Sequence, residues 1–355
     1  MWGASPRNRR KDAQRKPVRA LILGGGGARG AYEAGVVAAL VEREQFDIIC
    51  GTSIGAVNGM FVAQDEPDRM IDVWRTISTR GITQLKPELT VLMMLWEAAN
   101  GILRSPFHQK PSHAVSMLRA LPQLGGARLT SLMGLFDNGN VCRVVEEIAD
   151  FAALRRTFVV GVTNLSNGRA DSFAYFPQHR AAEELTFHRA ENAEPMTAVN
   201  YARAVCASAA LPPVYEPVSI VCKDGVERQF SDGAFTNNAP IRQAIDAGAT
   251  EITCVFVSPS RVPGHEQRAD SMMDIASVML DANTERMLEL DIKLTQRINE
   301  NVVAGLAPGK RYISLRMIGP SIPLNLPTLG FENQVEVDRL FELGFSDGRS
   351  AAAAA

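Results

Sequence analysis

The sequence predicts an α/β domain built around a mostly parallel β-sheet that helices cover. Two strand–turn–helix units follow each other within about 45 residues near the N-terminus. Further strand-like runs recur between residues 157 and 317, and a long helical pattern interrupts them late in the chain. Strands that alternate with helices are typical of parallel sheets, because a crossover must carry the chain back between neighbouring strands.

The first unit begins at residue 18. Residues 18–23 form a short apolar run typical of a buried strand, and four glycines follow it at 24–27. Beyond the glycines, apolar residues stand at helical spacing: Ala34, Val37, Ala38 and Val41. We therefore expect a strand, a glycine-rich turn and a helix in this order.

The second unit repeats this arrangement. Residues 46–50 are a second strand-like run, and a tight turn centred on Ser53 follows it. The helix expected after the turn is rich in small residues, namely Gly55, Ala56, Gly59 and Ala63. Side chains of this size let a helix approach a sheet closely.

Residues 66–150 differ from the segments on either side. They combine Pro-, Gly- and Met-rich helical pieces without a convincing strand. Strands are expected again at 157–162, 171–176, 214–221, 227–230, 251–257 and 312–317, with a long helix at about 272–300 and a short terminal helix. We expect one domain at 18–350 with a helical insertion at 66–150, a basic arm at 1–17 and a polyalanine tail at 351–355.

The charge is distributed unevenly along the chain. The formal net charge is −2, yet residues 1–19 carry seven basic side chains and one acidic side chain, which leaves an acidic body. A nucleic-acid footprint normally covers a folded face, so this pattern argues against a nucleic-acid-binding domain. Two interpretations of the arm stay open: peripheral contact with anionic lipid headgroups, or a solvated tail.

The cysteines and the hydropathy of the sequence indicate in which cellular compartment the protein is expected. The five cysteines are scattered, and none belongs to a CxxC pair, which argues against a disulfide framework or a zinc site. No apolar stretch approaches the roughly 18 residues of a membrane-spanning helix, and the N-terminus lacks the apolar region of a secretory signal. We expect a cytoplasmic protein whose membrane contact, if any, is peripheral.

Ser53 is the candidate nucleophile. It occupies the G-x-S-x-G turn at 51–55, between a predicted strand and a predicted helix. The glycines relieve the crowding of a sharp strand-to-helix turn, which lifts the serine Oγ clear of the sheet edge. The helix N-terminus beside it favours developing negative charge.

A serine hydroxyl needs a general base, and the histidines fit that role poorly. None of the five follows a late strand as the triad of an α/β-hydrolase requires. Asp232 is the better candidate, because it comes directly after the predicted strand 227–230 and a glycine follows it. Taken alone, an Asp-Gly pair is more often an ordinary turn.

The glycine-rich loop at 24–30 is a candidate oxyanion site. Successive backbone N–H groups in such a loop form a nest for anions at a helix start. Gly25, Gly27 and Gly30 also match a dinucleotide fingerprint, which requires an acid at the end of the second strand. Asp47 lies at the start of that strand instead, which disfavours the dinucleotide alternative.

Together these motifs resemble the patatin-like phospholipase family. Its glycine-rich loop, G-x-S-x-G turn and D-G-A/G motif appear in order at 25–30, 51–55 and 232–234. Residues 207–213 resemble a fourth block of the family, and Asn237, Asn238 and Pro240 match the polar run that follows D-G-A/G. The resemblance spans roughly residues 18–260.

The resemblance implies a three-layer α/β/α patatin-like sandwich and a catalytic dyad without histidine. Ser53 is expected to attack an ester carbonyl while Asp232 takes its proton. Gly25, Gly26 and Gly27 are expected to stabilise the oxyanion, with Arg29 holding the loop in shape. The expected substrate is a lipid ester. The sequence shows neither a metal site nor a calcium-loop pattern of acids, so we expect hydrolysis without metal or cofactor.

Two further points stay open. The helical pieces at 88–135 fall where the family often has a lid or an acyl-chain groove, although ordinary core packing explains their Met and Trp residues equally well. Besides the dinucleotide-binding alternative, a catalytically idle, regulatory family member is a third hypothesis. The intact Ser53, Asp232 and glycine loop disfavour it.

Overall fold

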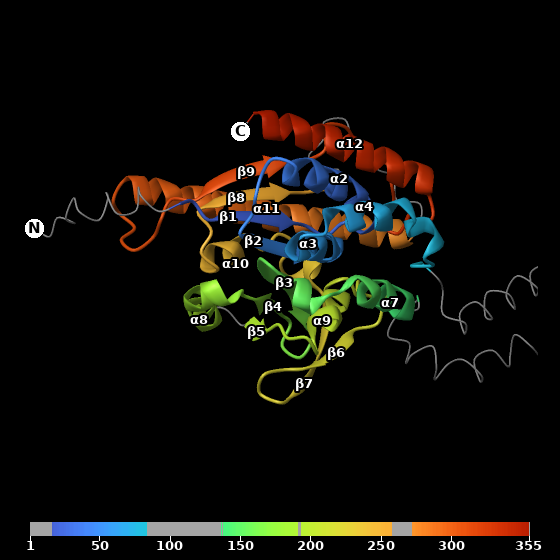
Figure 1. The fold of residues 1–355 in the computed structure, drawn as a ribbon, viewed down its shortest axis with the longest axis horizontal. Coiled ribbons are helices and arrows are strands. Elements are labelled where there is room, and N and C mark those ends of the chain that lie inside the picture. Colours follow the sequence, from blue (N-terminus) through green and yellow to red (C-terminus); the bar gives the residue numbers. More distant parts are fainter. Residues whose placement is uncertain (1–15, 84–135, 137, 191–192, 258–271, 355) are drawn as a thin grey trace, which may run out of the picture.

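The computed structural model describes residues 16–83, 136, 138–190, 193–257 and 272–354. Within them the chain forms a nine-stranded sheet with helices on both faces, which confirms the predicted fold class (Figure 1). The strands are β1 Arg19–Leu23, β2 Ile48–Thr52, β3 Thr157–Asn164, β4 Arg169–Tyr175, β5 Ala193–Pro195, β6 Val218–Val221, β7 Glu227–Asp232, β8 Glu251–Val255 and β9 Ser314–Ile318. The helices are α2 Gly30–Val41, α3 Ile54–Gln64, α4 Pro67–Arg75, α7 Asn138–Ile148, α8 Ala181–Ala190, α9 Tyr201–Ser208, α10 Ile241–Asp246, α11 Met272–Val303 and α12 Gln334–Ala353.

The sheet is parallel at its centre and mixed at one side. Its strand order is β5-β4-β3-β2-β1-β8-β9. The pairs β3–β2, β2–β1, β1–β8 and β8–β9 are parallel, as the two strand–turn–helix units predict. Strand β4 pairs with β3 antiparallel, and β7 pairs antiparallel with both β3 and β6.

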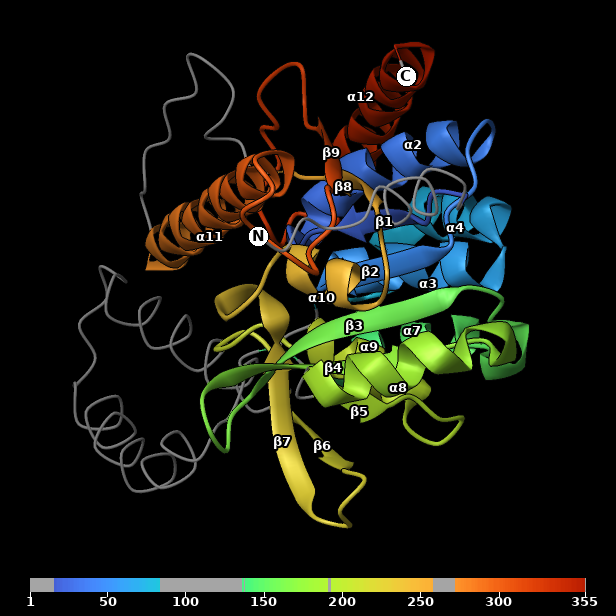
Figure 2. The ribbon, with the colours of Figure 1, turned by 90° about the vertical axis from the view of Figure 1, so that its left-hand side faces the viewer.

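Alternate residues of the central strands face two separate hydrophobic cores. Leu21 and Leu23 of β1 face a core that α2, α3, α4, α7, α9 and α12 cover. Ala20 and Ile22 face the opposite core under α8, α10 and α11. Because successive side chains of a strand point to opposite faces, both faces of the sheet are apolar and both are covered by helices, which gives three layers. Figure 2 shows α11 across the sheet from α2 and α4.

Strand β3 brings β2 and β7 end to end. Thr52, the last residue of β2, pairs with Gly161, while Asp232, the last residue of β7, pairs with Val162. Because β4 occupies the other edge of β3 along its length, β2 and β7 share one edge and their carboxyl ends meet. Ser53 and Asp232 therefore come together at one point of the sheet.

Several elements differ from their predicted bounds. The strand expected at 214–221 begins only at Val218, and the terminal helix is α12, a 20-residue element that includes part of the polyalanine run. The short strand β5 and the helices α8, α9 and α10 were not predicted from the sequence, because each is short or weakly periodic. The expected lid helices at 88–135 and nearly all of the basic arm lie outside the described residues.

Candidate active site

Ser53 stands in a strained turn between β2 and α3. Its φ of 56° and ψ of −129° are unusual for a residue with a side chain, and such strain is typical of functional turns. The turn has no room for larger neighbours: a Cβ at Gly51 or Gly55 would lie 2.4 Å or 2.3 Å from a backbone oxygen. The two glycines of the motif are therefore required by close packing rather than by positive φ.

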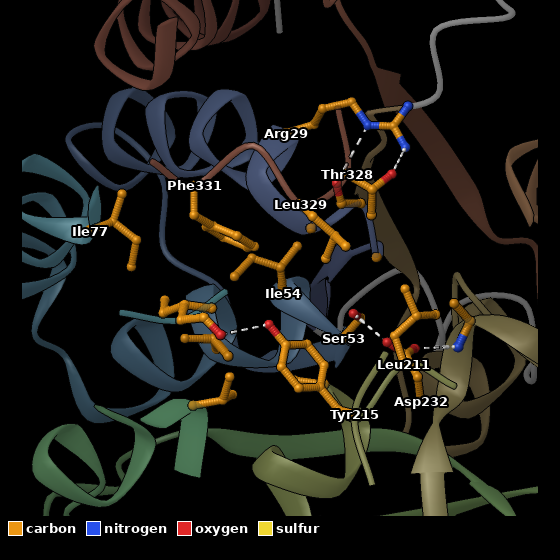
Figure 3. A pocket seen from close by; sticks show the side chains of 18 of the residues that line it. Arg29, Ser53, Ile54, Ile77, Leu211, Tyr215, Asp232, Thr328, Leu329 and Phe331 are labelled. Atoms are coloured by element: carbon orange, nitrogen blue, oxygen red, sulfur yellow. Dashed lines mark hydrogen bonds between the residues drawn. The ribbon is translucent and has the colours of Figure 1, made fainter. Parts of the chain in front are cut away.

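Asp232 faces Ser53 directly. The Ser53 Oγ donates a hydrogen bond of 2.6 Å to Asp232 Oδ2, and the Ala234 N–H donates one of 2.8 Å to Oδ1. The carboxyl group is 1% exposed, and this burial raises its pKa to about 7, although both hydrogen bonds lower it. A carboxylate with a pKa near neutrality can act as a general base at physiological pH. Figure 3 shows the pair at the floor of a pocket.

The C-terminal end of α9 and the residues directly after it hold both residues in place. Ser208 accepts a hydrogen bond of 2.9 Å from the Ser53 N–H and donates one of 2.6 Å to the Gly161 carbonyl. Two residues later, the Ala210 carbonyl accepts a hydrogen bond of 3.0 Å from the Asp232 N–H. The segment 208–210 thus connects the Ser53 turn, strand β3 and the end of strand β7 that carries Asp232.

The glycine-rich loop lies against Ser53. A Cβ at Gly25 would come within 2.9 Å of the Ser53 Cβ, so only glycine fits there. The Gly25 N–H donates to Asn238 Oδ1 at 2.8 Å. Within the described residues the N–H groups of Gly26 and Gly27 have no acceptor, and both residues line the same pocket as Ser53.

Arg29 points away from Ser53. Its guanidinium forms a two-point ion pair with Asp281 of α11, with N–O distances of 2.7 and 3.0 Å, and also donates to Thr328 Oγ1 at 3.2 Å. Figure 3 shows Arg29 beside Thr328, above the dyad. Arg29 therefore joins the glycine loop to the C-terminal part of the chain.

An apolar pocket opens from the dyad. It encloses about 950 Å³ of empty space, part of it open to solvent. Tyr215 and Ile82 both line the pocket, and the Tyr215 hydroxyl donates a hydrogen bond of 3.0 Å to the Ile82 carbonyl. The other apolar residues of the wall come from several elements: Ile54, Val57, Phe61, Val73, Trp74, Ile77, Val141, Val144, Val145, Ala209, Leu211, Leu280, Leu329 and Phe331. Such a wall suits a hydrocarbon chain.

Three polar contacts of the site were not predicted. Ser208 and Asn238 were placed in motif blocks from the sequence, but their hydrogen bonds to Ser53 and Gly25 could be read only from the fold. Asp281 had no signal at all, because an acid on a long helix looks like an ordinary solvated residue. In the part of the chain that the structure describes, no three His, Cys, Asp or Glu side chains are grouped to hold a metal ion. No helix of that part is long and apolar enough to cross a membrane.

Comparison with known proteins shows which family the chain resembles. A family model described as patatin-like phospholipase matches residues 21–245, more than half of the chain. A lysophospholipase of Aspergillus terreus is 59% identical over 46 residues, which are 13% of this chain and 3% of that protein. A putative patatin-like phospholipase domain-containing protein of Caenorhabditis elegans is 52% identical over 44 residues, 12% of this chain and 4% of that protein. The chain thus matches only a few per cent of the length of these relatives.

Two solved structures are also similar. VipD from Legionella pneumophila aligns with 96% of this chain and 67% of its own chain, at 13% identity and a TM-score of 0.41. The ExoU–SpcU complex from the type III secretion system of Pseudomonas aeruginosa aligns with 79% of this chain and 52% of that chain, at 16% identity and a TM-score of 0.27.

Proposed function

The chain belongs to the patatin-like phospholipase family, and on this premise we propose that it is a serine acyl hydrolase that cleaves fatty-acyl esters of lipids. The reaction is of the phospholipase A or lysophospholipase type and uses a dyad of Ser53 and Asp232. The observation that carries this proposal is the 2.6 Å hydrogen bond from the Ser53 Oγ to a buried carboxylate at the foot of an apolar pocket.

Ser53 is the nucleophile and Asp232 is its general base. As the Ser53 Oγ bonds to the ester carbonyl carbon, its proton passes to Asp232 Oδ2, and the carbonyl oxygen becomes an oxyanion. When the intermediate collapses, the leaving alcohol takes that proton from Asp232, and the acyl group stays on Ser53. Water then repeats these steps with Asp232 as base and releases the fatty acid.

The oxyanion donors are the N–H groups of Gly26 and Gly27. The Gly25 N–H is already bound to Asn238, so it supports the shape of the loop rather than the developing charge. One such donor contributes about 3–4 kcal/mol to the stabilisation of a transition state. Arg29 has a supporting role, because its charge is satisfied by Asp281.

The acyl chain of the substrate occupies the apolar pocket. Side chains of α3, α4 and α7 line it, and they leave few polar groups away from the dyad. A hydrocarbon chain gains about 0.8 kcal/mol per buried methylene, so binding improves with chain length until the pocket is full.

The test is hydrolysis of p-nitrophenyl esters, phospholipids and lysophospholipids, with fluorophosphonate labelling of the nucleophile. Ser53→Ala is expected to lose both labelling and hydrolysis. Asp232→Asn is expected to stay folded and lose about 10²- to 10⁴-fold in rate, the contribution of a general base.

The matched control is Asp171→Asn, the same substitution on β4, across β3 from Asp232. It is expected to keep the wild-type rate. Wild-type hydrolysis that persists in Asp232→Asn contradicts the dyad. A wild-type protein that hydrolyses none of the esters contradicts the proposed function itself.

A further inference from the structure

We propose that Asp281 of α11 is a positioning residue for acyl transfer. It acts through Arg29 and fixes the direction in which the amides of Gly26 and Gly27 point. This inference rests on the proposed function, because it concerns the oxyanion site of the same reaction. It assigns a role to a part of the chain beyond residues 21–245, which the family model matches.

Within the glycine loop, Arg29 makes only long hydrogen bonds, from its backbone N–H and Nε to the Gly26 carbonyl at 3.3 and 3.4 Å. Four consecutive glycines lack the side chains that restrict φ and ψ, and Gly27 has a φ of +58°. A donor contributes fully to transition-state stabilisation only if its direction is set before the charge develops. Contacts with residues outside the loop are therefore needed at both of its ends: Asn238 holds the Gly25 N–H, and the other end is held through Ala28 and Arg29.

Asp281 holds Arg29 through two parallel hydrogen bonds. Its two carboxylate oxygens lie 2.7 and 3.0 Å from Nη2 and Nη1 of Arg29. The side chain of Asp281 is only 16% exposed and that of Arg29 only 5%, so water cannot easily replace either partner. A planar, two-point contact fixes orientation as well as distance.

Thr328 adds two contacts to the Arg29–Asp281 pair, and we call these three residues the clamp. Its carbonyl accepts a hydrogen bond of 2.8 Å from the Ala28 N–H, one residue after Gly27. Its hydroxyl lies 3.2 Å from Arg29 Nη2 and 2.9 Å from the hydroxyl of Ser277, which also belongs to α11. Ala28 and Arg29 are thus held by α11 and Thr328, while the Gly26 and Gly27 N–H groups have no acceptor among the residues that the structure describes.

The expected consequence is a change in kcat without a change in KM. Asp281, Arg29 and Thr328 also line the pocket, but the apolar side chains of α3, α4 and α7 that are proposed to hold the acyl chain are unchanged in the variants, so ground-state binding of the substrate is expected to be preserved. Misplacement of an oxyanion donor affects only the transition state, and a shift on the order of 1 Å lowers a rate by about 10²-fold.

The experiment compares Asp281→Asn, Asp281→Glu and Glu289→Gln in the full chain with a soluble p-nitrophenyl ester. Glu289 is the matched control, since it forms exposed ion pairs with Arg286 and Lys293 on the same helix. Active sites are titrated with a fluorophosphonate, and thermal unfolding is recorded for each variant.

Asp281→Asn is expected to lower kcat per titrated site about 10- to 100-fold with an unchanged KM. Asp281→Glu restores the carboxylate and is expected to recover part of kcat, and Glu289→Gln is expected to match the wild type. If Asp281→Asn only lowers the melting temperature or the titrated fraction, with wild-type kcat per site, the positioning role is refuted.

If Asp281→Asn does not fold, Asp281→Glu tests the positioning role instead. That variant keeps the charge and moves the carboxylate by one methylene, so a reduced kcat with normal KM supports the role and a wild-type kcat overturns it. A wild-type protein without any Ser53-dependent hydrolysis refutes the proposed function, and the positioning role falls with it.

Discussion

The proposed role of Asp232 as a general base depends on its burial. Its carboxyl group has almost no contact with solvent, and burial raises its pKa from 3.8 to about 7. The hydrogen bonds from Ser53 and Ala234 favour the ionised form but do not offset burial. An exposed aspartate would be too weak a base to accept a proton from serine near neutral pH.

This pKa predicts how activity depends on pH. Because Asp232 must be ionised to act as base, kcat/KM is expected to rise with pH and level off above about 7, with a single apparent ionisation. The measurement is a pH profile of kcat/KM on a p-nitrophenyl ester. A profile that stays flat between about pH 5 and 8 is incompatible with Asp232 as the base.

Stability is expected to change with pH in the opposite direction. A folded pKa above the unfolded value means that the contribution of Asp232 to stability is full below about pH 3.8 and is lost as pH rises through about 7. Asp232→Asn should therefore gain stability relative to wild type over that range. Denaturant unfolding of both proteins at several pH values measures this difference, and Asp171→Asn serves as the control.

Ser208 is predicted to act on the rate through Ser53. Ser208→Ala leaves the Ser53 N–H and the Gly161 carbonyl without their partner inside the protein. We expect a loss of about 1–3 kcal/mol in unfolding free energy and a fall in kcat of about 10- to 100-fold.

The control for Ser208 is Ser172→Ala, which truncates another buried serine, on β4. Enzyme kinetics and denaturant unfolding are measured for both variants. Equal kcat values for the two variants would show that Ser208 does not position the nucleophile.

At the scale of elements, strand β3 decides where Ser53 and Asp232 meet. It pairs parallel with β2 and antiparallel with β7, so two strands end at the same point from opposite directions. Glycine is needed where they meet, since a Cβ at Gly233 would lie 2.5 Å from the Gly161 carbonyl oxygen. The sequence predicted β2, β3 and β7 as separate strands, but periodicity contains no information about which strands pair.

Helix α12 packs on α2 at a distance that only glycine allows at the points of contact. A Cβ at Gly344 of α12 would lie 1.9 Å from the Tyr32 carbonyl of α2, and a Cβ at Gly35 would lie 2.0 Å from the Phe341 carbonyl. The two helices thus meet backbone to backbone. Because α2 begins directly after the glycine loop, this contact also supports the site.

Gly344→Ala is therefore predicted to destabilise the fold. The added methyl group must push α12 away from α2, and overpacking of this kind lowers the unfolding free energy by about 1–3 kcal/mol. Thermal and denaturant unfolding measure the loss. Ser350→Ala, at an exposed position of α12, is the control and should unfold like the wild type; an unchanged Gly344→Ala protein would contradict the close contact.

At the scale of the whole molecule, the site is assembled from distant parts of the chain. Ser53 and Asp232 are 179 residues apart, and Arg29 and Asp281 are 252 residues apart. The pocket draws its wall from both ends of the chain, including Leu329 and Phe331 near α12. The C-terminal region therefore contributes to the proposed active site as well as to the sheet and the helices that cover it.

The sequence by itself determined the alternation of strands and helices, the glycine loop, the Ser53 turn and the Asp-Gly motif. These are local features, because apolar spacing and glycine positions act on neighbouring residues. The resemblance of the motifs implied that Ser53 and Asp232 act as a pair, but only the tertiary structure decided the geometry of their contact, the hydrogen bond from the Gly25 N–H to Asn238 and the ion pair of Arg29 with Asp281. Contacts across such separations, and the burial that raises the pKa of Asp232, exist only after the sheet has brought its strand ends together.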